Sequence, residues 1–242
     1  MFAWSVPDNV GFAVSTRDGG VSLPPFNSLN LGDHVDDDPR AVAENRRRVQ
    51  ALFAMPGQPV WLEQVHGTDV VTLPLNPLEV HANRADASYT KLPGQVCAVM
   101  TADCLPILLC DRQGTEVAAV HAGWRGLCNG VIEAALQKFL APACDIQALI
   151  GPAIGPTAFE VGAEVREAFV IADIAADKAF LPASPGKYFG NLEMLAHQRL
   201  VAAGITDIHC TSECTYTLSE KYFSYRKSPK TGRFASFIWL KN

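Results

Sequence analysis

Residues 96–126 read VCAVMTADCLPILLCDRQGTEVAAVHAGWRG, and this stretch decides the fold class. Val96–Met100 and Leu105–Cys110 are apolar runs of the length and composition typical of buried strands. Arg112-Gln113-Gly114 then turns the chain into a third run, Glu116–His121, so the last two runs predict a hairpin. Buried strands in a chain that also carries helical segments indicate a mixed α/β fold.

Helical and strand-like segments alternate along the rest of the chain without a strict βαβ rhythm. A proline in the first turn supports a helix over Arg40–Leu52. The patterns also predict helices over Asn129–Leu140, Ala163–Ala176 and Leu192–Ala203, and strands over Val10–Thr16, Pro59–Gln64, Ala148–Ile150, Thr206–Thr211 and Arg233–Leu240. Because the sequence shows no repeat and no linker, we expect a single domain over residues 1–242.

Composition and charge narrow the class of protein. The chain has 242 residues, 48% of them hydrophobic, which is enough to bury a core without a structural metal or disulfides. Its net charge of −5 argues against nucleic acid as the main partner. No signal peptide or membrane-spanning run is visible. Seven cysteines without a framework spacing indicate reduced thiols, so we expect a cytoplasmic protein without a membrane partner.

Three short segments each place one side chain that can bind a metal at a predicted strand end. His66 lies in Gln64-Val65-His66-Gly67, Cys104 follows Thr101-Ala102-Asp103, and His121 precedes Ala122-Gly123-Trp124-Arg125-Gly126. Glycine beside a histidine lets backbone or ligand approach closely. Taken singly, each residue also fits an ordinary structural role, and the spacings match no zinc-finger pattern.

Convergence of His66, Cys104 and His121 would produce a reactive metal site. Two imidazoles and one thiolate suit zinc or copper. A structural zinc takes four protein ligands, whereas three leave one position open for water or substrate. Zinc lowers the pKa of a bound water to about 7, which makes a nucleophile available at neutral pH.

Seven motifs of the chain resemble the YfiH family, and they occur in order from about residue 11 to residue 240. The family has been called a polyphenol oxidase or laccase domain and a purine nucleoside phosphorylase, and it includes the laccase-domain protein of mammalian macrophages. The motifs are Ser15-Thr16-Arg17-Asp18-Gly19-Gly20-Val21-Ser22, Gln64-Val65-His66-Gly67, Ala85-Asp86-Ala87, Thr101-Ala102-Asp103-Cys104-Leu105-Pro106, His121-Ala122-Gly123-Trp124-Arg125-Gly126, Ile150-Gly151-Pro152-Ala153-Ile154-Gly155 and Phe223-Ser224-Tyr225-Arg226.

The resemblance carries specific expectations. It implies a layered α/β sandwich related to the catalytic domain of cytotoxic necrotising factor, with His66, Cys104 and His121 as zinc ligands. It also implies phosphorolysis of adenosine, inosine and S-methyl-5′-thioadenosine, together with deamination of adenosine to inosine. The partners would then be purine nucleosides and inorganic phosphate.

Further polar residues are candidates for catalysis or binding. Arg17 beside Gly19-Gly20 could bind phosphate or belong to a plain turn held by Asp18. Arg125 before the predicted helix could bind phosphate or pack locally with Trp124. Asp103 could orient a ligand histidine or relay a proton, although strand alternation would turn it to the opposite face, and Asp86 is the alternative. Four further residues could contact the substrate: Asn27, Asn30, Asn45 and Arg46. Asn45 and Arg46 also fit an exposed helix face.

The remaining histidines have no recognisable motif. They are His34, His81, His197 and His209. His209 and Cys210 lie close to Cys214, but the spacing suits a helix where the pattern predicts a strand, so we expect no second metal site.

Three other functions remain open from the sequence. The cluster could hold copper in a polyphenol oxidase, although six histidines are too few for a multicopper laccase. Cys104 and His121 could instead form the nucleophile and base of a metal-free hydrolase. A zinc ion could also brace a binding module without catalysis. Either a monomer or a homodimer fits the chain.

Overall fold

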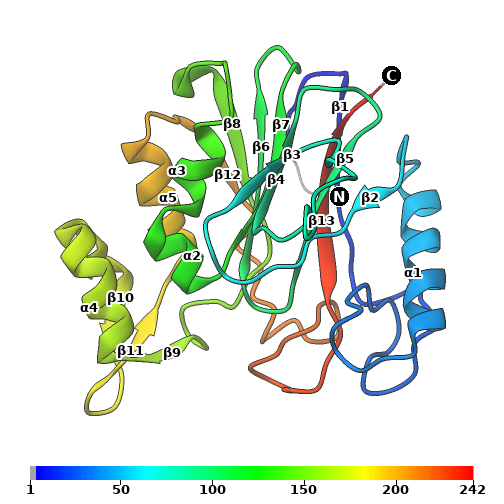
Figure 1. The fold of residues 1–242 in the computed structure, drawn as a ribbon. Helices are drawn as coiled ribbons and strands as arrows, with labels where there is room; N and C mark the ends of the chain where they lie inside the picture. Colours follow the sequence, from blue (N-terminus) through cyan, green and yellow to red (C-terminus); the bar gives the residue numbers. More distant parts are fainter. Residues whose placement is uncertain (1–3, 242) are drawn as a thin grey trace.

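The computed structural model describes residues 4–241 of the chain (Figure 1). Its two larger sheets have the strand orders β1-β13-β5-β2 and β12-β8-β6-β7-β4-β3. The strands are β1 Val10–Val14, β2 Pro59–Val60, β3 Val70–Thr72, β4 Ala87–Thr90, β5 Val96–Thr101, β6 Leu105–Asp111, β7 Val117–Ala122, β8 Ile146–Ile150, β9 Glu160–Gly162, β10 Phe180–Pro182, β11 Lys187–Gly190, β12 Asp207–Cys210 and β13 Phe234–Leu240.

The two larger sheets pack face to face. Side chains alternate along each strand, so successive residues enter different cores. Cys97 and Val99 of β5 join a core between the sheets with Leu108 of β6 and Ala119 of β7. The predicted hairpin is confirmed, since β6 and β7 pair antiparallel with Leu105 opposite Ala122.

Helices cover the outer faces of both sheets, which produces a layered arrangement (Figure 1). The six-stranded sheet carries α2, α3 and α5 on its outer face, where Leu127 and Leu195 join its core. Val49 of α1 belongs to the core on the outer face of the four-stranded sheet. The helices are α1 Pro39–Leu52, α2 Trp124–Asn129, α3 Val131–Leu136, α4 Ala163–Ala172 and α5 Leu192–Ala202, with 3-10 turns at Ala143–Asp145 and Ile174–Ala179.

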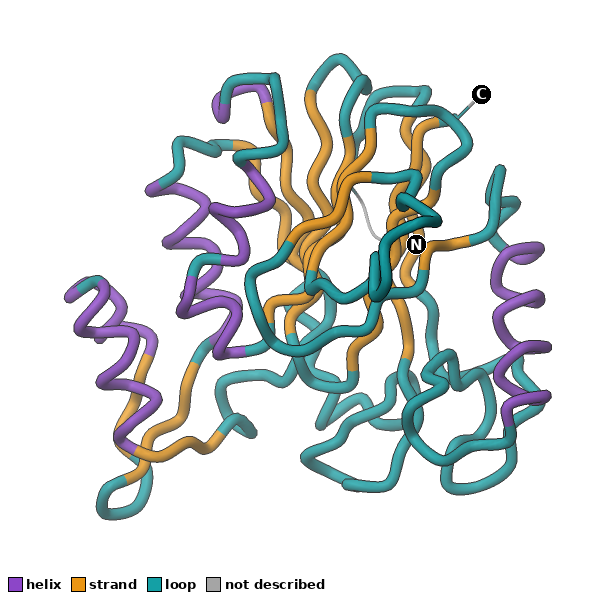
Figure 2. Tube along the Cα trace, viewed as in Figure 1, coloured by secondary structure: helices purple, strands orange, loops and turns teal. Residues whose placement is uncertain are grey.

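A smaller unit projects beside the helices of the six-stranded sheet (Figure 1). It consists of α4 and the three-stranded antiparallel sheet β10-β11-β9. Figure 2 shows that long loops gather at the end of the main sheets nearest this unit. The loops before α1 and before β13 both reach this end, so side chains far apart in the sequence meet there.

The predicted mixed α/β class is confirmed, but several predicted elements were wrong in extent. The helix predicted over Asn129–Leu140 begins at Trp124 and is interrupted at Gly130, whose φ of 100° breaks the helical backbone. The strand predicted over Pro59–Gln64 keeps only two residues. The helix expected to reach Ala176 ends at Ala172 and gives way to a 3-10 turn. The likeness to the necrotising-factor catalytic domain stays a prediction.

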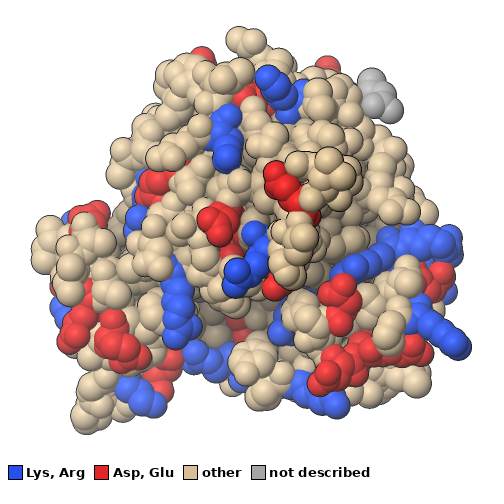
Figure 3. Space-filling model, viewed as in Figure 1, with Lys and Arg blue, Asp and Glu red and all other residues tan. Residues whose placement is uncertain are grey.

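Three global features complete the description of the fold. None of the helices within residues 4–241 is long and apolar enough to cross a membrane. All seven cysteines lie in the described part of the chain and are free thiols. Figure 3 shows acidic and basic side chains interleaved on the visible face.

Candidate metal centre and its cavity

The structure brings His66, Cys104 and His121 together. One ligand atom from each of the three lies within 4.8 Å of the others. Cys104 Sγ is 3.7 Å from His66 Nε2, and the two imidazole rings meet edge to face with centroids 4.8 Å apart. His66 is exposed, Cys104 is half-buried and His121 is buried, so the cluster is open on the His66 side.

Strand ends and glycines create this convergence. His121 lies near the end of β7 opposite Pro106 of β6, and Cys104 directly precedes β6. A Cβ atom at Gly123 would lie 2.5 Å from His66 Cδ2 and 3.2 Å from Cys104 Sγ. Only glycine therefore leaves room for both ligands at this position.

The buried Asp86 carboxylate holds the His66 segment and the His121 ring in place. This carboxylate is fully buried and accepts hydrogen bonds from the backbone N–H groups of Val65, His66 and Gly67. Its Oδ1 also lies 2.8 Å from His121 Nδ1. Donation from Nδ1 leaves His121 Nε2 as the ring atom able to bind a metal, the role expected of an outer-shell carboxylate.

Charge coupling favours the thiolate of Cys104 and the protonated ring of His121, so metal binding would displace the His121 proton. Burial raises the pKa of Cys104, but the neighbouring His121 and His66 rings outweigh it and bring that pKa to about 6. Burial lowers the pKa of His121, yet the Cys104 thiolate and Asp86 raise it to about 9. Because a metal-bound thiol must be a thiolate, Cys104 is prepared for that role at neutral pH.

The residues present fit a metal ion with an open position. Two imidazole nitrogens and a thiolate are the donor set that zinc accepts in three-ligand catalytic sites. The Asp86–His121 contact supplies the usual outer support. His66, Cys104 and His121 would hold the ion, and no fourth protein ligand belongs to the cluster in the described residues.

The cluster opens into a cavity of about 350 Å³. One part of its wall is apolar, and another part carries cationic or amide side chains. The lining residues are His34, Gln64, His66, Met100, Thr101, Ala102, Asp103, Cys104, His121, Trp124, Ile154, Phe159, Leu192, Tyr225, Arg226 and Arg233.

Asp103 lines the cavity, but it makes no hydrogen bond to a ligand histidine. It lies in a bend with φ 95° rather than in a strand, so the alternation argument against it does not apply. Its Oδ1 accepts a hydrogen bond from the Thr215 hydroxyl and its Oδ2 accepts one from the Arg226 N–H, both at 2.6 Å. The structure therefore places Asp86, and not Asp103, against His121.

The two arginines expected to bind phosphate lie outside the cavity lining. The Arg17 guanidinium donates to the carbonyls of Asn27 and Ser219 and stacks on Phe223. Arg125 is exposed and lies over the Trp124 ring at 4.4 Å. Helix α2 begins at Trp124, so Arg125 is inside its first turn and not ahead of a helix starting near residue 129.

Of the asparagines expected to contact substrate, Asn30 and Asn45 are buried and bonded within the fold, whereas Asn27 is exposed; none of them lines the cavity. Asn30 Oδ1 accepts from the N–H groups of Gly32 and Arg233. The prediction of an exposed face was wrong for Asn45, which is fully buried and donates to the Asn30 carbonyl. Arg46 is half-buried and stacks over Trp61 at 4.3 Å.

Sequence reasoning missed three basic side chains of the cavity wall. They are His34, Arg226 and Arg233. Arg226 lies within a recognised motif and could have been found by asking which charged residue that motif contains. His34 and Arg233 had no local signal, because only the folded loops bring them to the cluster. His209 pairs with Asp207 at 3.1 Å and joins no metal-binding group in the described chain.

Comparison with known proteins places this geometry in context. Residues 11–241 match the family model described as multi-copper polyphenol oxidoreductase laccase. The chain is 56% identical over 237 residues to a Shigella flexneri protein named purine nucleoside phosphorylase YfiH, covering 98% of this chain and 96% of that one. It is 52% identical over 240 residues to a purine nucleoside phosphorylase of Pseudomonas aeruginosa, covering 99% of this chain and 97% of the relative.

Solved structures agree with these matches. A Neisseria meningitidis protein superposes with a TM-score of 0.92 at 43% identity, covering 99% of this chain and 97% of the other. YlmD from Geobacillus stearothermophilus superposes with a TM-score of 0.86 at 31% identity, covering 97% and 93%. The similarity therefore extends over the whole layered fold.

Proposed function

The chain belongs to the YfiH family, as its motifs predicted, and we propose on that premise that it is a zinc-dependent purine nucleoside phosphorylase. The substrates would be adenosine, inosine and S-methyl-5′-thioadenosine, and adenosine would also be deaminated to inosine. The observation that carries the proposal is that the His66–Cys104–His121 cluster shares one cavity with Arg226 and Arg233.

The two cavity arginines support binding of inorganic phosphate. Arg226 is exposed, and its Nη1 donates to the Glu160 carbonyl. Arg233 is half-buried, and its Nη1 donates to the carbonyls of Thr231 and Gly232. Each guanidinium therefore has a fixed direction and keeps further N–H donors for a phosphate oxygen. These residues replace Arg17 and Arg125 in the proposal.

The apolar wall supports binding of a purine ring. Trp124, Phe159 and Tyr225 contribute aromatic faces to the cavity, and Ile154 and Leu192 contribute aliphatic surface. Aromatic faces bind bases by stacking and tolerate different purines. Such a wall would suit both adenine and hypoxanthine nucleosides, as the proposal requires.

The chain's own residues would prepare the reacting groups. Zinc, when bound, supplies a Lewis acid and lowers the pKa of water. Asp86 holds His121 in one tautomer, and Gly123 lets His66 approach Cys104. In phosphorolysis, a phosphate oxygen held by the arginines bonds to C1′ of ribose while the C1′–N9 bond breaks. In deamination, the oxygen of water replaces the exocyclic amine, which leaves as ammonia.

Two other chemistries remain to be separated from this proposal. The family model's description favours copper and oxidation of phenols, and the same three ligands suit copper. A metal-free hydrolase would use the Cys104–His121 pair as nucleophile and base.

We also propose one domain over residues 1–242, a monomer or homodimer, and a cytoplasmic location consistent with seven free cysteines.

The test is to purify the protein, measure zinc and copper, and follow each nucleoside with and without phosphate by chromatography. We expect adenine and ribose 1-phosphate from adenosine only when phosphate is present, and inosine independently of phosphate. If zinc-loaded protein yields neither purine base nor inosine, the purine proposal fails. Phenol oxidation by copper-loaded protein alone would favour the oxidase.

A further inference from the structure

A departing purine needs a proton, and none of the proposed metal ligands is free to give it. When the C1′–N9 bond breaks, the bonding electrons pass into the purine ring, and protonation at N7 stabilises the leaving base. We propose that His34 is the catalytic general acid that donates this proton, an assignment that rests on the proposed phosphorolysis.

The chemistry of the cavity wall selects His34. The two other lining histidines, His66 and His121, are assigned to the metal with Cys104. Asp103 is buried and already accepts two hydrogen bonds at 2.6 Å. Arg226 and Arg233 stay charged and cannot release a proton near neutral pH. Within the described wall, His34 is the uncommitted imidazole.

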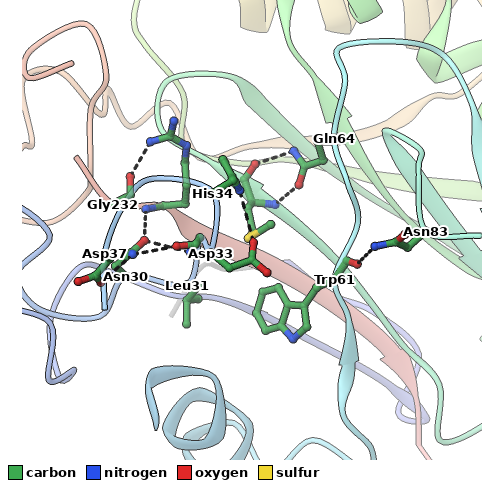
Figure 4. A network of polar contacts seen from close by, with 12 residues as sticks. Asn30, Leu31, Asp33, His34, Asp37, Trp61, Gln64, Asn83 and Gly232 are labelled. Atoms are coloured by element: carbon green, nitrogen blue, oxygen red, sulfur yellow. Dashed lines mark hydrogen bonds and ion pairs between the residues drawn. The ribbon is translucent and has the colours of Figure 1, made fainter. Parts of the chain in front are cut away.

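Hydrogen bonds hold the backbone just before His34, at Asn30, Leu31 and Gly32. Asn30 Oδ1 accepts from the N–H groups of Gly32 and Arg233 at 2.9 and 2.8 Å. The Leu31 N–H donates to the Arg233 carbonyl, and the Leu31 carbonyl accepts from Arg46 Nε. Figure 4 shows the polar contacts of Asn30 beside the segment that carries Asp33 and His34. A side chain on a braced loop can be held in a reactive geometry.

A carboxylate supports the protonated ring. Asp33 Oδ1 lies 3.6 Å from His34 Nδ1, a charge-pair distance once the ring is protonated. The other Asp33 oxygen is 3.2 Å from Arg46 Nη2, and Arg46 stacks over Trp61. Asp33 therefore faces Nδ1 and leaves Nε2 to meet the substrate. This arrangement gives Asn30 and Arg46 a positioning role in place of substrate contact.

The proton balance of the step is complete. Nε2 of the imidazolium transfers its proton to purine N7 as the C1′–N9 bond breaks, and the base leaves neutral. A phosphate oxygen forms the new bond to C1′. His34 becomes neutral and regains a proton from water before the next turnover.

Surrounding charges set the direction of the pH dependence. Burial and the positive charge of Arg233 lower the pKa of His34 below 6.5, and Asp33 partly opposes them while Arg46 adds to the lowering. A general acid must be protonated, so kcat with inosine should fall as pH rises through this lowered pKa. Removal of the imidazole should remove that alkaline limb.

The decisive experiment compares two nucleosides in zinc-loaded His34→Gln. Inosine needs a proton at N7, whereas 7-methylguanosine already carries a positive charge there and leaves without one. We expect kcat with inosine to fall about 100-fold or more, the usual contribution of a general acid. With 7-methylguanosine, we expect kcat to change by less than about threefold, because acid assistance is not needed.

His81→Gln is the matched control, since His81 Nδ1 lies 3.7 Å from Glu63 and outside the cavity lining. It should leave both activities unchanged. Equal losses on both nucleosides, or none on inosine, would overturn the role of His34. So would a pH profile that keeps the same alkaline limb in His34→Gln, a measurement that needs only inosine. Wild-type protein that cleaves neither nucleoside would overturn the phosphorylase proposal and the acid together.

Discussion

The two ends of strands β6 and β7 both carry buried carboxylates, but the group of side chains able to hold a metal ion in the described chain lies at only one of them. At the hairpin end, Glu116 accepts hydrogen bonds from the Leu140 and Ala141 N–H groups and from the Tyr89 hydroxyl. Asp111 there accepts from the Thr115 N–H and hydroxyl. At the opposite end, Asp86 has the same kind of support from backbone N–H groups.

Cavity size does not distinguish the two ends. The hairpin end has a cavity of about 430 Å³, larger than the 350 Å³ at the metal-cluster end. Its carboxylates Asp111 and Glu116 are engaged by the protein itself. At the other end, His66 is exposed and Arg226 keeps free N–H donors. The cluster of metal-binding side chains, and not volume, therefore distinguishes the two ends.

The largest expected difference concerns two cysteines at opposite ends of β6: Cys104 directly before the strand and Cys110 near its other end. Cys104→Ala should reduce bound zinc from about one per chain to almost none and abolish nucleoside cleavage, because two ligands hold zinc weakly. Cys110 is fully buried at the far end of the strand. The Cys110→Ala variant should still bind about one zinc per chain, and its free energy of unfolding should fall by about 1 kcal/mol. Metal analysis and denaturant unfolding measure both quantities.

Chelated wild-type protein provides the control for that pair. It should remain folded and inactive, since the core is large enough without the ion. Unfolding on chelation would instead indicate that the metal braces the structure. Zinc retained by Cys104→Ala would remove Cys104 from the ligand set.

The buried carboxylates provide the next comparison. Asp86→Asn should weaken zinc binding about 10- to 100-fold, because an amide supports the His121 tautomer less well. Glu116→Gln should leave zinc affinity unchanged and destabilise the fold by about 1 to 3 kcal/mol, since it disturbs buried hydrogen bonds. Competition with a chromophoric chelator and thermal unfolding separate the two effects. Equal zinc affinity in both variants would mean that Asp86 does not support the site.

Thiol reactivity in metal-free protein should differ between the same two ends. Histidine charges outweigh burial at Cys104 and set its pKa to about 6, whereas burial and Asp111 raise the pKa of Cys110 to about 12. At pH 7, Cys104 is mostly thiolate, and its alkylation should slow about tenfold between pH 7 and pH 5. Iodoacetamide labelling resolved by mass spectrometry tests this. Fast labelling of Cys110, or a Cys104 rate that does not fall with acid, would contradict it.

Local patterns predicted much of the fold. The strand predicted over Val96–Met100 and the hairpin that follows are confirmed. They were predictable because short apolar runs bounded by turn residues are typical of buried strands. Short strands such as β3 and β4 were missed because pairing with neighbours, and not composition, makes them strands. Helix α2 was missed because Gly123 and Gly126 suggest a loop, although contact with the His66 segment requires glycine at both positions.

Site residues could be predicted from the sequence only where the residue type itself indicates a specific chemistry. His66, Cys104 and His121 could be selected because imidazoles and thiols bind metals and lie at predicted strand ends. Arginine carries no such distinction. Arg17 and Arg125 were expected at the site, whereas long-range loop packing brings Arg233 to the cavity. The sequence therefore shows which residues are charged, but not which of them the fold brings to the cavity.

The smallest expected effect separates those arginines. Arg125 is exposed and stacks on Trp124, so Arg125→Gln should change the KM for phosphate by less than about twofold, as expected of a surface substitution. Arg233→Gln removes a guanidinium from the cavity wall and should raise the same KM about tenfold, the cost of one charge-assisted hydrogen bond. Initial rates at varied phosphate and saturating inosine measure both. The opposite ranking would return phosphate binding to the start of α2, and equal KM values would show that neither arginine binds it. The expected ranking would establish that phosphate is held by the loop packed against Asn30, far in sequence from the metal ligands and adjacent to them in the fold.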